Sequence, residues 1–68
     1  MTVGQRIKQL REERGWRQTY LAVEVDLSFE MIYAYERDKS TPRLKTLAKF
    51  CDAFGITPEE FMKGVEIR

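Results

Sequence analysis

The sequence predicts a small all-α domain of five helices. Three observations favour this class. Apolar residues recur at the three- and four-residue spacing of helices, and capping and stop residues divide the chain into five such segments. The third observation is that the 68 residues include only one cysteine and no histidine. Neither an intramolecular disulfide nor a Cys/His zinc site can therefore stabilise so small a core. We therefore expect one domain over residues 1–68, stabilised by regular helix packing.

A first helix is expected between Thr2 and Gly15. Thr2 followed by Gln5 resembles a capping box, and Gly15 is a natural helix stop. The buried stripe of this helix has the spacing i, i+4 and i+7 and consists of Val3, Ile7 and Leu10. The opposite face is most simply a solvated surface made by Arg6, Lys8, Glu12, Glu13 and Arg14. We expect Trp16 to pack at the junction with the next helix, because core packing is far commoner for such a residue than stacking on nucleic acid.

Residues 18–36 contain two short amphipathic helices separated by a tight turn. The first apolar stripe consists of Leu21, Ala22 and Val25, and the second begins with Ile32 and Tyr35. Asp26 falls where the first of these helices must end in a left-handed residue, a conformation that Asp tolerates better than most residues. Ser28 then caps the second helix. The small side chain of Ala22 leaves room for a steep helix crossing. This spacing is typical of a DNA-binding motif.

With its flanks, this stretch resembles the phage-repressor-like (XRE-type, Cro/cI-type) helix-turn-helix family, over roughly residues 3 to 62. The positions that carry the resemblance are Gln18, Leu21, Ala22, Ser28, Ile32, Tyr35 and Glu36. The resemblance implies a compact five-helix lambda-repressor-like DNA-binding domain with its motif at residues 18–36. It also implies that Arg11 and Glu36 form a structural pair across the core, although Arg11 as an ordinary surface residue is the alternative.

Two further helices are expected after the motif. The fourth begins at about Leu44, ends at Gly55 and buries Leu47, Phe50, Cys51 and Phe54. The fifth is short and begins with Thr57 as the cap, Pro58 as the first helical residue and a glutamate three residues after the cap. Residues 65–68 alternate apolar and charged side chains, so they form either a frayed tail or a strand that pairs with a second copy.

Composition excludes several functional classes. One cysteine and no histidine rule out a disulfide framework, a Cys/His zinc site and a histidine-dependent nucleophile, so we expect neither an enzyme nor a cofactor or metal. No apolar run approaches the length needed to span a membrane, and the amino terminus lacks the pattern of a signal peptide, which predicts a cytoplasmic protein. The formal net charge of +1 is low for a protein that binds nucleic acid. Attraction to phosphate must therefore come from local clusters of cations.

An angular count divides the third helix into two faces, since successive helical residues are about 100° apart. The inward face is predicted to consist of Met31, Ile32, Tyr35 and Glu36. The outward face, which would contact bases in the major groove, is predicted to consist of Phe29, Glu30, Tyr33 and Ala34. It contains none of the Arg, Lys, Gln or Asn side chains that make bidentate base contacts. The alternative is that Glu30 only complements the helix dipole and the aromatic residues bind a protein.

Contacts to the DNA backbone are expected at two places. At the start of the second helix, Arg17 stands where the family usually has a capping Ser or Thr, and it adds a cation beside Gln18. After the third helix, the loop 37–43 contains three cations, although many exposed loops are charged. The residues predicted to contact phosphates are Arg17, Gln18, Thr19, Ser28, Arg37, Lys39, Ser40, Thr41 and Arg43.

These features predict a sequence-specific regulator of transcription, a repressor that binds double-stranded DNA as a homodimer on a palindromic operator. A dimerisation tail is predicted at residues 61–68, with an interface made by Phe61, Met62, Val65 and Ile67. In the alternative, Phe61 and Met62 close the core of the monomer and the tail is loose. The alternative function is a protein-interaction module on the same scaffold, an antitoxin or regulatory subunit that uses the aromatic face of the third helix.

Overall fold

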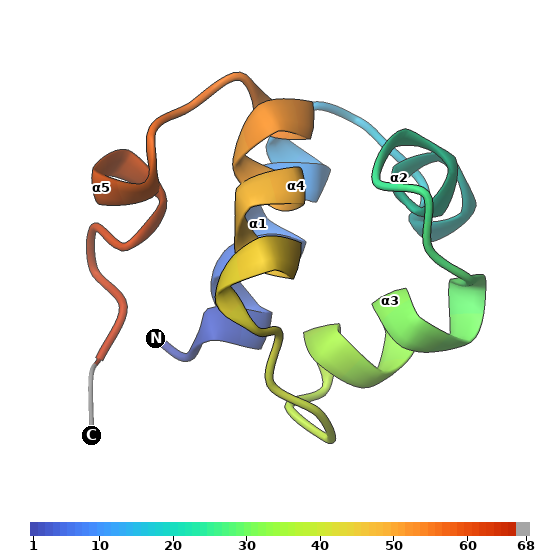
Figure 1. Ribbon diagram of the computed structural model, residues 1–68, viewed down its shortest axis with the longest axis horizontal. Coiled ribbons are helices and arrows are strands. Elements are labelled where there is room, and N and C mark those ends of the chain that lie inside the picture. Colours follow the sequence, from blue (N-terminus) through green and yellow to red (C-terminus); the bar gives the residue numbers. More distant parts are fainter. Residues whose placement is uncertain (67–68) are drawn as a thin grey trace.

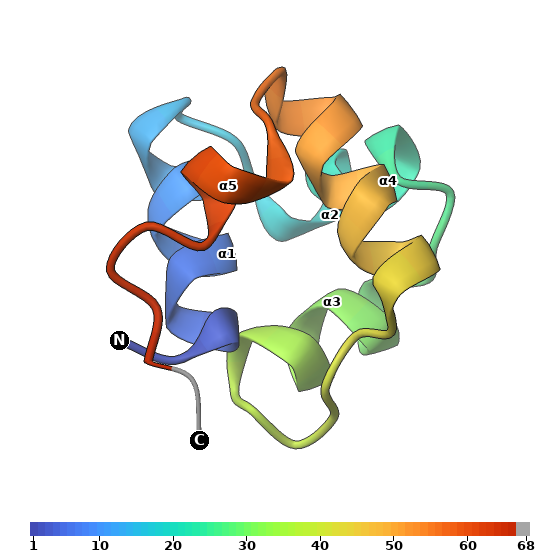
Figure 2. The ribbon, with the colours of Figure 1, turned by 60° about the vertical axis from the view of Figure 1, so that its left-hand side comes forward.

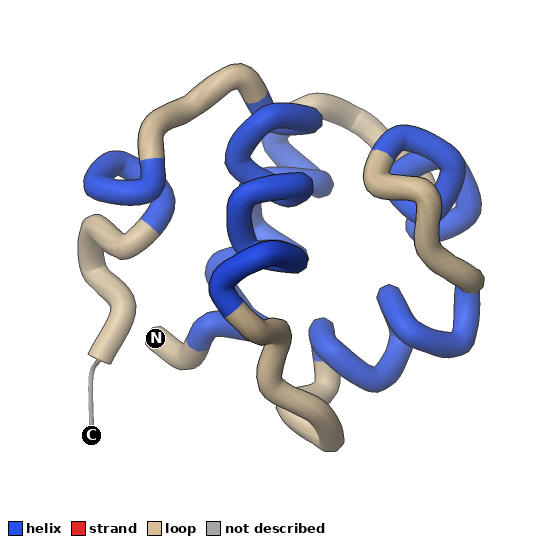
Figure 3. Tube along the Cα trace, viewed as in Figure 1, coloured by secondary structure: helices blue, strands red, loops and turns tan. Residues whose placement is uncertain are grey.

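The computed structural model describes residues 1–66, which form five helices and no strand (Figures 1 and 3). The helices are α1 (Val3–Glu13), α2 (Gln18–Glu24), α3 (Phe29–Glu36), α4 (Leu44–Phe54) and α5 (Pro58–Phe61). The all-α prediction is confirmed, with the helices at the predicted places. Over residues 1–66 no helix has both the length and the apolar character needed to cross a bilayer.

The helices surround a single core. In Figure 1, α1 and α4 occupy the middle of the molecule, α2 and α3 lie on one side of them, and α5 lies on the other side. Helix α3 packs against both α1 and α2, while α5 packs against α4. The turned view in Figure 2 shows the loop after α3 leading directly into the first turn of α4. This order leaves α3 at the edge of the molecule, with one face on the core and one in solvent.

The core consists of most of the predicted stripe residues, but Val3 and Leu47, which were predicted to be buried, are only half-buried against it. Its buried apolar residues are Ile7, Leu10, Leu21, Ala22, Val25, Ile32, Tyr35, Phe50, Cys51, Phe54 and Phe61. Phe50 lies at its centre, stacked on Phe54 with ring centroids 6.3 Å apart and edge-on to Tyr35 at 6.0 Å. Trp16 packs between Phe54 and Tyr20, at centroid distances of 5.8 and 5.0 Å. Packing of this kind is the main source of stability in a domain without cross-links.

Side-chain caps begin three of the helices. The capping box of Thr2 and Gln5 is present in both directions at α1. Ser28 Oγ accepts a hydrogen bond from the Met31 N–H at α3, and Thr57 caps α5 in the same way. At the start of α2, the Arg17 side chain makes no capping hydrogen bond within the described residues. This agrees with its chemistry, because a guanidinium cannot accept a hydrogen bond from a backbone N–H.

Asp38 joins the loop after α3 to the start of α1. Its φ of 59° is in the left-handed region, where an Asp is tolerated. Its carboxylate accepts hydrogen bonds from the Thr2 hydroxyl at 2.6 Å and from the Gly4 N–H at 3.1 Å. A Cβ at Gly4 would overlap the carbonyl oxygen of Tyr35, so only glycine allows α1 and α3 to approach this closely. The loop is thereby anchored at its first turn.

The prediction that Arg6 and Arg14 belong to a solvated face is wrong. Arg6 donates to the carbonyl oxygens of Phe61 and Glu60, each at 2.8 Å. Arg14 donates to the carbonyl of Phe54 at 2.8 Å and its guanidinium lies 5.0 Å from the centroid of that ring. The last carbonyls of a helix have no partner within the helix, and the five donors of Arg can supply one. The two arginines therefore connect α1 to the ends of α5 and α4.

The predicted dimer interface at the carboxyl end also needs correction. Phe61 is 1% exposed and belongs to the core, so it is not available to a partner. Met62 and Val65 are half-buried. Residues 65 and 66 are neither frayed nor a strand, because the Val65 N–H donates to the Met62 carbonyl and the Glu66 N–H donates to the Met1 carbonyl. Ile67 lies outside the described residues. A single apolar residue in a four-residue helix gives no stripe from which its direction could be predicted.

Candidate nucleic-acid interface

Three side chains form an exposed ridge along α3, spaced four residues apart. Phe29 and Tyr33 are 43% and 41% exposed, with ring centroids 6.2 Å apart. The Arg37 guanidinium lies over the Tyr33 ring at 5.2 Å from its centroid. We call these three residues the α3 ridge. Glu30 is exposed and Ala34 half-buried on the same helix. The four side chains predicted to contact bases thus lie off the core, as the angular count indicated.

The predicted burial of Met31 is wrong. It was predicted to face inward, but it is 37% exposed. The buried face of α3 is centred on Ile32, with Tyr35 and Glu36 close by. Met31 is about 100° from Ile32 around the helix, which places it at the border of the two faces. The exposed part of α3 is therefore wider and more apolar than predicted.

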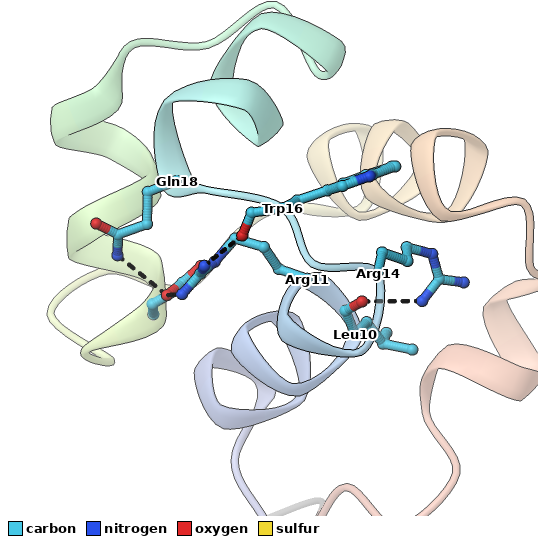
Figure 4. A network of polar contacts seen from close by, with 6 residues as sticks. Leu10, Arg11, Arg14, Trp16 and Gln18 are labelled. Carbon is cyan, nitrogen blue, oxygen red and sulfur yellow. Dashed lines mark hydrogen bonds and ion pairs between the residues drawn. The ribbon is translucent and has the colours of Figure 1, made fainter.

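A buried ion pair holds the end of α3 against α1. Arg11 Nε donates to Glu36 Oε2 at 2.6 Å, and Arg11 Nη2 donates to Glu36 Oε1 at 3.0 Å. Arg11 Nη1 also donates to the Trp16 carbonyl at 2.7 Å (Figure 4). The hydrogen bond with Glu36 raises the pKa of Arg11 above its ordinary value, against the opposing effect of burial. The two side chains implied to pair are thus in bidentate contact, and Arg11 is no ordinary surface residue.

Gln18 extends this network to α2. Its Nε2 donates to Glu36 Oε1 at 3.0 Å, and Figure 4 shows the amide directed toward the ion pair. Glu36 therefore receives hydrogen bonds from α1 and α2 while it ends α3. The network fixes the orientation of α3 relative to the start of α2. Only part of the hydrogen-bonding capacity of the Gln18 amide remains for a phosphate.

The remaining predicted phosphate contacts are accessible. Arg17 and Thr19 are exposed at the start of α2, and Ser28 is exposed at the start of α3. The Ser28 oxygen accepts a hydrogen bond from the backbone, but its O–H is still free to donate. The loop 37–43 exposes its charged and hydroxyl side chains Arg37, Lys39, Ser40, Thr41 and Arg43.

The electrostatics of the loop depend on Asp38. This residue is the only acid in the sequence 37–43, and its carboxylate is hydrogen-bonded to the start of α1. Asp38 is itself exposed, but the three cations Arg37, Lys39 and Arg43 against its one carboxylate leave the loop with a formal charge of +2. A chain with a net charge of only +1 thus has a local cationic surface next to the α3 ridge. Glu30 is the acidic exception on the exposed face of α3.

Neither of these surfaces has the features of a catalytic or metal site. In the part of the chain that the structure describes, no group of three or more Cys, Asp or Glu side chains is arranged to hold a metal ion. Burial raises the pKa of the Cys51 thiol, which keeps it protonated and unreactive in the core. The exposed groups of the α3 ridge and of the loop are aromatic rings, hydroxyls and cations.

Comparison with known proteins identifies the family. A family model described as helix-turn-helix matches residues 7–61. The chain belongs to the helix-turn-helix family. Its relatives include the immunity repressor protein of Bacillus phage phi105, which is 46% identical over 56 residues, covering 82% of this chain and 39% of the relative. The HTH-type transcriptional regulator DdrOP3 of Deinococcus deserti is 33% identical over 66 residues, covering 97% of this chain and 51% of the relative. This helix-turn-helix chain thus spans about half the length of these curated relatives, or less.

The P22 c2 repressor provides the structural comparison. The solution structure of its DNA-binding domain matches with a TM-score of 0.87 and 28% sequence identity, covering 94% of this chain and 84% of that one. Its crystal structure in complex with a synthetic operator matches with a TM-score of 0.83 and 28% identity, covering 94% and 97% of the two chains. The five-helix arrangement is therefore that of a repressor DNA-binding domain.

Two parts of the candidate interface were not predicted from the helix-turn-helix pattern. One is the stacking of Arg37 on Tyr33, for which the four-residue spacing along α3 was an available signal. The other is the role of Asp38 in anchoring the loop. Its partners Thr2 and Gly4 lie more than thirty residues earlier, and no local pattern in the sequence indicates contacts of that range.

Proposed function

We propose that this helix-turn-helix chain is a sequence-specific double-stranded DNA-binding regulator of transcription, a repressor that acts as a homodimer on a palindromic operator. The observation that carries the proposal is the continuity of two exposed features. The α3 ridge ends at Arg37, the residue with which the cationic loop begins. A recognition helix in the major groove requires side chains for bases on the helix and cations for phosphates beside it.

The proposed base contacts are apolar and polar rather than bidentate. Phe29 and Ala34 are suited to pack on thymine methyl groups, and the Tyr33 hydroxyl is suited to a base edge or a phosphate. Glu30 can accept a hydrogen bond from a cytosine amine, which favours C·G pairs at one position. Because Arg37 lies over the Tyr33 ring, its charge offsets part of the repulsion between Glu30 and the phosphates.

The proposed phosphate contacts flank the recognition helix on two sides. Arg17, Gln18, Thr19 and Ser28 would contact the backbone from α2 and the start of α3. The loop would contribute Arg37, Lys39, Ser40, Thr41 and Arg43. The P22 c2 repressor, which shares this fold, has been crystallised with a synthetic operator. That likeness supports DNA as the partner of the present chain.

The proposed homodimer follows from the limited reach of one short helix. Helix α3 has eight residues, and a helix of that length contacts only a few base pairs. Two copies related by a two-fold axis would double the phosphate contacts and place α3 in successive major grooves, about 34 Å apart. The operator would then be a palindrome with half-sites one helical turn apart.

The phosphate contacts can be tested by salt titration. The logarithm of the affinity for duplex DNA is expected to fall linearly with the logarithm of salt concentration, because bound cations release counterions. Lys39→Ala and Arg43→Ala should each reduce the slope by about one, and should weaken binding similarly on any sequence. Fluorescence anisotropy with a labelled duplex between about 50 and 200 mM salt measures both effects.

Lys8→Ala is the matched control, since Lys8 is exposed on α1 and no DNA contact is proposed for it. Its slope should equal that of the wild type. No duplex binding at the lowest salt, or an affinity that does not change with salt, would reject the proposed function. Such a result would favour a protein partner for the exposed aromatic face of α3.

A further inference from the structure

We infer that the exposed face of α3 distinguishes the methylation state of a cytosine in the major groove. Methylation of that cytosine at C5 would strengthen binding, and methylation of its N4 amine would weaken it. This deepens the proposed function, on which it rests, because a chemical mark on the DNA would then regulate binding. The two side chains responsible are Glu30 and Met31, in the first turn of α3.

Glu30 is a single carboxylate at the centre of an otherwise aromatic and apolar face. It lies about 200° around α3 from the buried Ile32, on the side opposite the core. Phe29 and Tyr33 lie on one side of it and Met31 on the other, and all three side chains are exposed. Within residues 1–66 its carboxylate takes part in no hydrogen bond or ion pair. Its oxygens are therefore available to accept hydrogen bonds from a ligand.

A carboxylate at this place weakens binding to most DNA sequences. The phosphates of a bound duplex would repel it, and the repulsion is offset only where a base donates a hydrogen bond to it. Cytosine presents its N4 amine in the major groove, whereas adenine presents an amine beside N7, an acceptor that would repel Glu30. One N–H of the cytosine amine pairs with guanine and the other is exposed in the groove. A methyl group at N4 replaces that exposed N–H, so Glu30 would lose its donor.

The C5 position of the same cytosine would lie beside the apolar part of this face. In the pyrimidine ring, C5 is bonded to the carbon that bears the amine, so a C5 methyl group projects into the major groove next to N4. It has the same place on the ring as the thymine methyl group, which side chains recognise by apolar contact. Met31 directly follows Glu30 in the sequence. A C5 methyl group would bury apolar surface against Met31 that an unmethylated cytosine leaves in water.

The cap of α3 holds Met31 in the part of a recognition helix that contacts base edges. Its N–H donates to Ser28 Oγ at 3.2 Å, which fixes its backbone in the first turn. The rings of Phe29 and Tyr33 pack on each other, with centroids 6.2 Å apart. The side chain of Met31 is unbranched and flexible, so it can adjust to a small apolar group. Met31 is therefore suited to contact a methyl group on the base that donates to Glu30.

The test uses one duplex in several chemical forms. The purified full chain first selects its site from a random pool of unmodified duplexes. Fluorescence anisotropy then measures its affinity for that site made with cytosine, with 5-methylcytosine or with N4-methylcytosine. The C5-methylated form should bind about fourfold more tightly for each methyl group that Met31 contacts. The N4-methylated form should bind at least about tenfold more weakly.

Two variants separate the two contacts, each compared with its own affinity for the unmodified duplex. Met31→Ala should lose the gain from C5 methylation and keep the loss from N4 methylation. Glu30→Ala should show the reverse pattern, because it keeps Met31 but has no acceptor. Val23→Ala is the matched control for Met31→Ala, since Val23 is an exposed apolar residue of α2 for which no DNA contact is proposed. It should respond to both modifications as the wild type does.

Thymine is the other source of a C5 methyl group, so a further form of the duplex contains deoxyuridine in place of thymine. Its weaker binding should be the same for the wild type and for Met31→Ala, because the proposed thymine contacts belong to Phe29 and Ala34. If Met31→Ala were insensitive to deoxyuridine, Met31 would contact a thymine and the inference would be overturned.

Three other outcomes would overturn the inference: a selected site without cytosine, equal affinity of the wild type for the unmodified and C5-methylated forms, or a Met31→Ala variant that keeps the full gain. The wild-type comparison does not depend on how any variant folds. A chain that selects a palindrome but does not respond to C5 methylation would overturn the inference and leave the proposed function standing. A chain that selects no sequence from the pool would reject the function and the inference together.

Discussion

Replacing Arg11 by alanine is expected to lower the free energy of unfolding by about 3–5 kcal/mol, the typical cost of removing one partner of a buried ion pair. The Glu36 side chain is 2% exposed and takes both of its contacts to α1 from Arg11. In the variant its charge would remain buried, with only the hydrogen bond from Gln18 to stabilise it. Urea denaturation followed by circular dichroism measures the change.

Arg17→Ala is the control for this substitution, since Arg17 is exposed and makes no side-chain cap within the described residues. Its effect should be within about 0.5 kcal/mol of zero. If Arg11→Ala unfolded within that same margin of the wild type, Glu36 would not depend on its partner for burial. Substituting both members of the pair with apolar residues of similar volume should recover much of the loss, because no charge is then left unpaired.

Ile32→Ala should destabilise the fold by about 2–5 kcal/mol through the cavity it leaves. Ile32 is 0% exposed, at the centre of the inward face of α3. A domain of this length has a total stability of only about 3–10 kcal/mol at the usual value per residue, so the melting temperature should fall markedly. Val23→Ala on α2 is the matched control and should have almost no effect, since that side chain is already in solvent.

A substitution on the opposite face of α3 tests the division of this helix into two faces. Ala34→Lys adds a long cation to the outward face and should leave the free energy of unfolding nearly unchanged. It should alter the preference among DNA sequences, because lysine can donate to guanine in the major groove. If Ala34→Lys unfolded instead, the division of α3 into an inward and an outward face would be wrong.

The features of the fold that the sequence predicted are local ones. Helix stripes such as Phe50, Cys51 and Phe54, and caps such as Ser28 and Thr57, depend on residues three or four positions apart. The contacts that a long side chain makes with a distant helix do not depend on such neighbours. The bonds of Arg6 to α5 and of Arg14 to the end of α4 span 55 and 40 residues respectively, which no pattern of neighbours indicates.

The same distinction applies to the candidate interface. The outward face of α3 could be predicted because the burial of Ile32 fixes the rotation of the helix. The exposure of Met31 could not be predicted, since a residue at the border of two faces is covered or exposed according to its tertiary neighbours. The hydrogen bonds of Gln18 to Glu36 and of Asp38 to Thr2 join different elements. Such hydrogen bonds depend on how separate helices pack together, which no local pattern in the sequence indicates.

Selection of bound duplexes from a random pool by the purified full chain tests the proposed function most directly. At about 50 mM salt, the enriched sequences are expected to contain an inverted repeat whose half-sites are about 10–10.5 base pairs apart, centre to centre. Thymines are expected at the positions that face Phe29 and Ala34. A bound fraction with the same sequence composition as the starting pool would contradict sequence-specific recognition by α3.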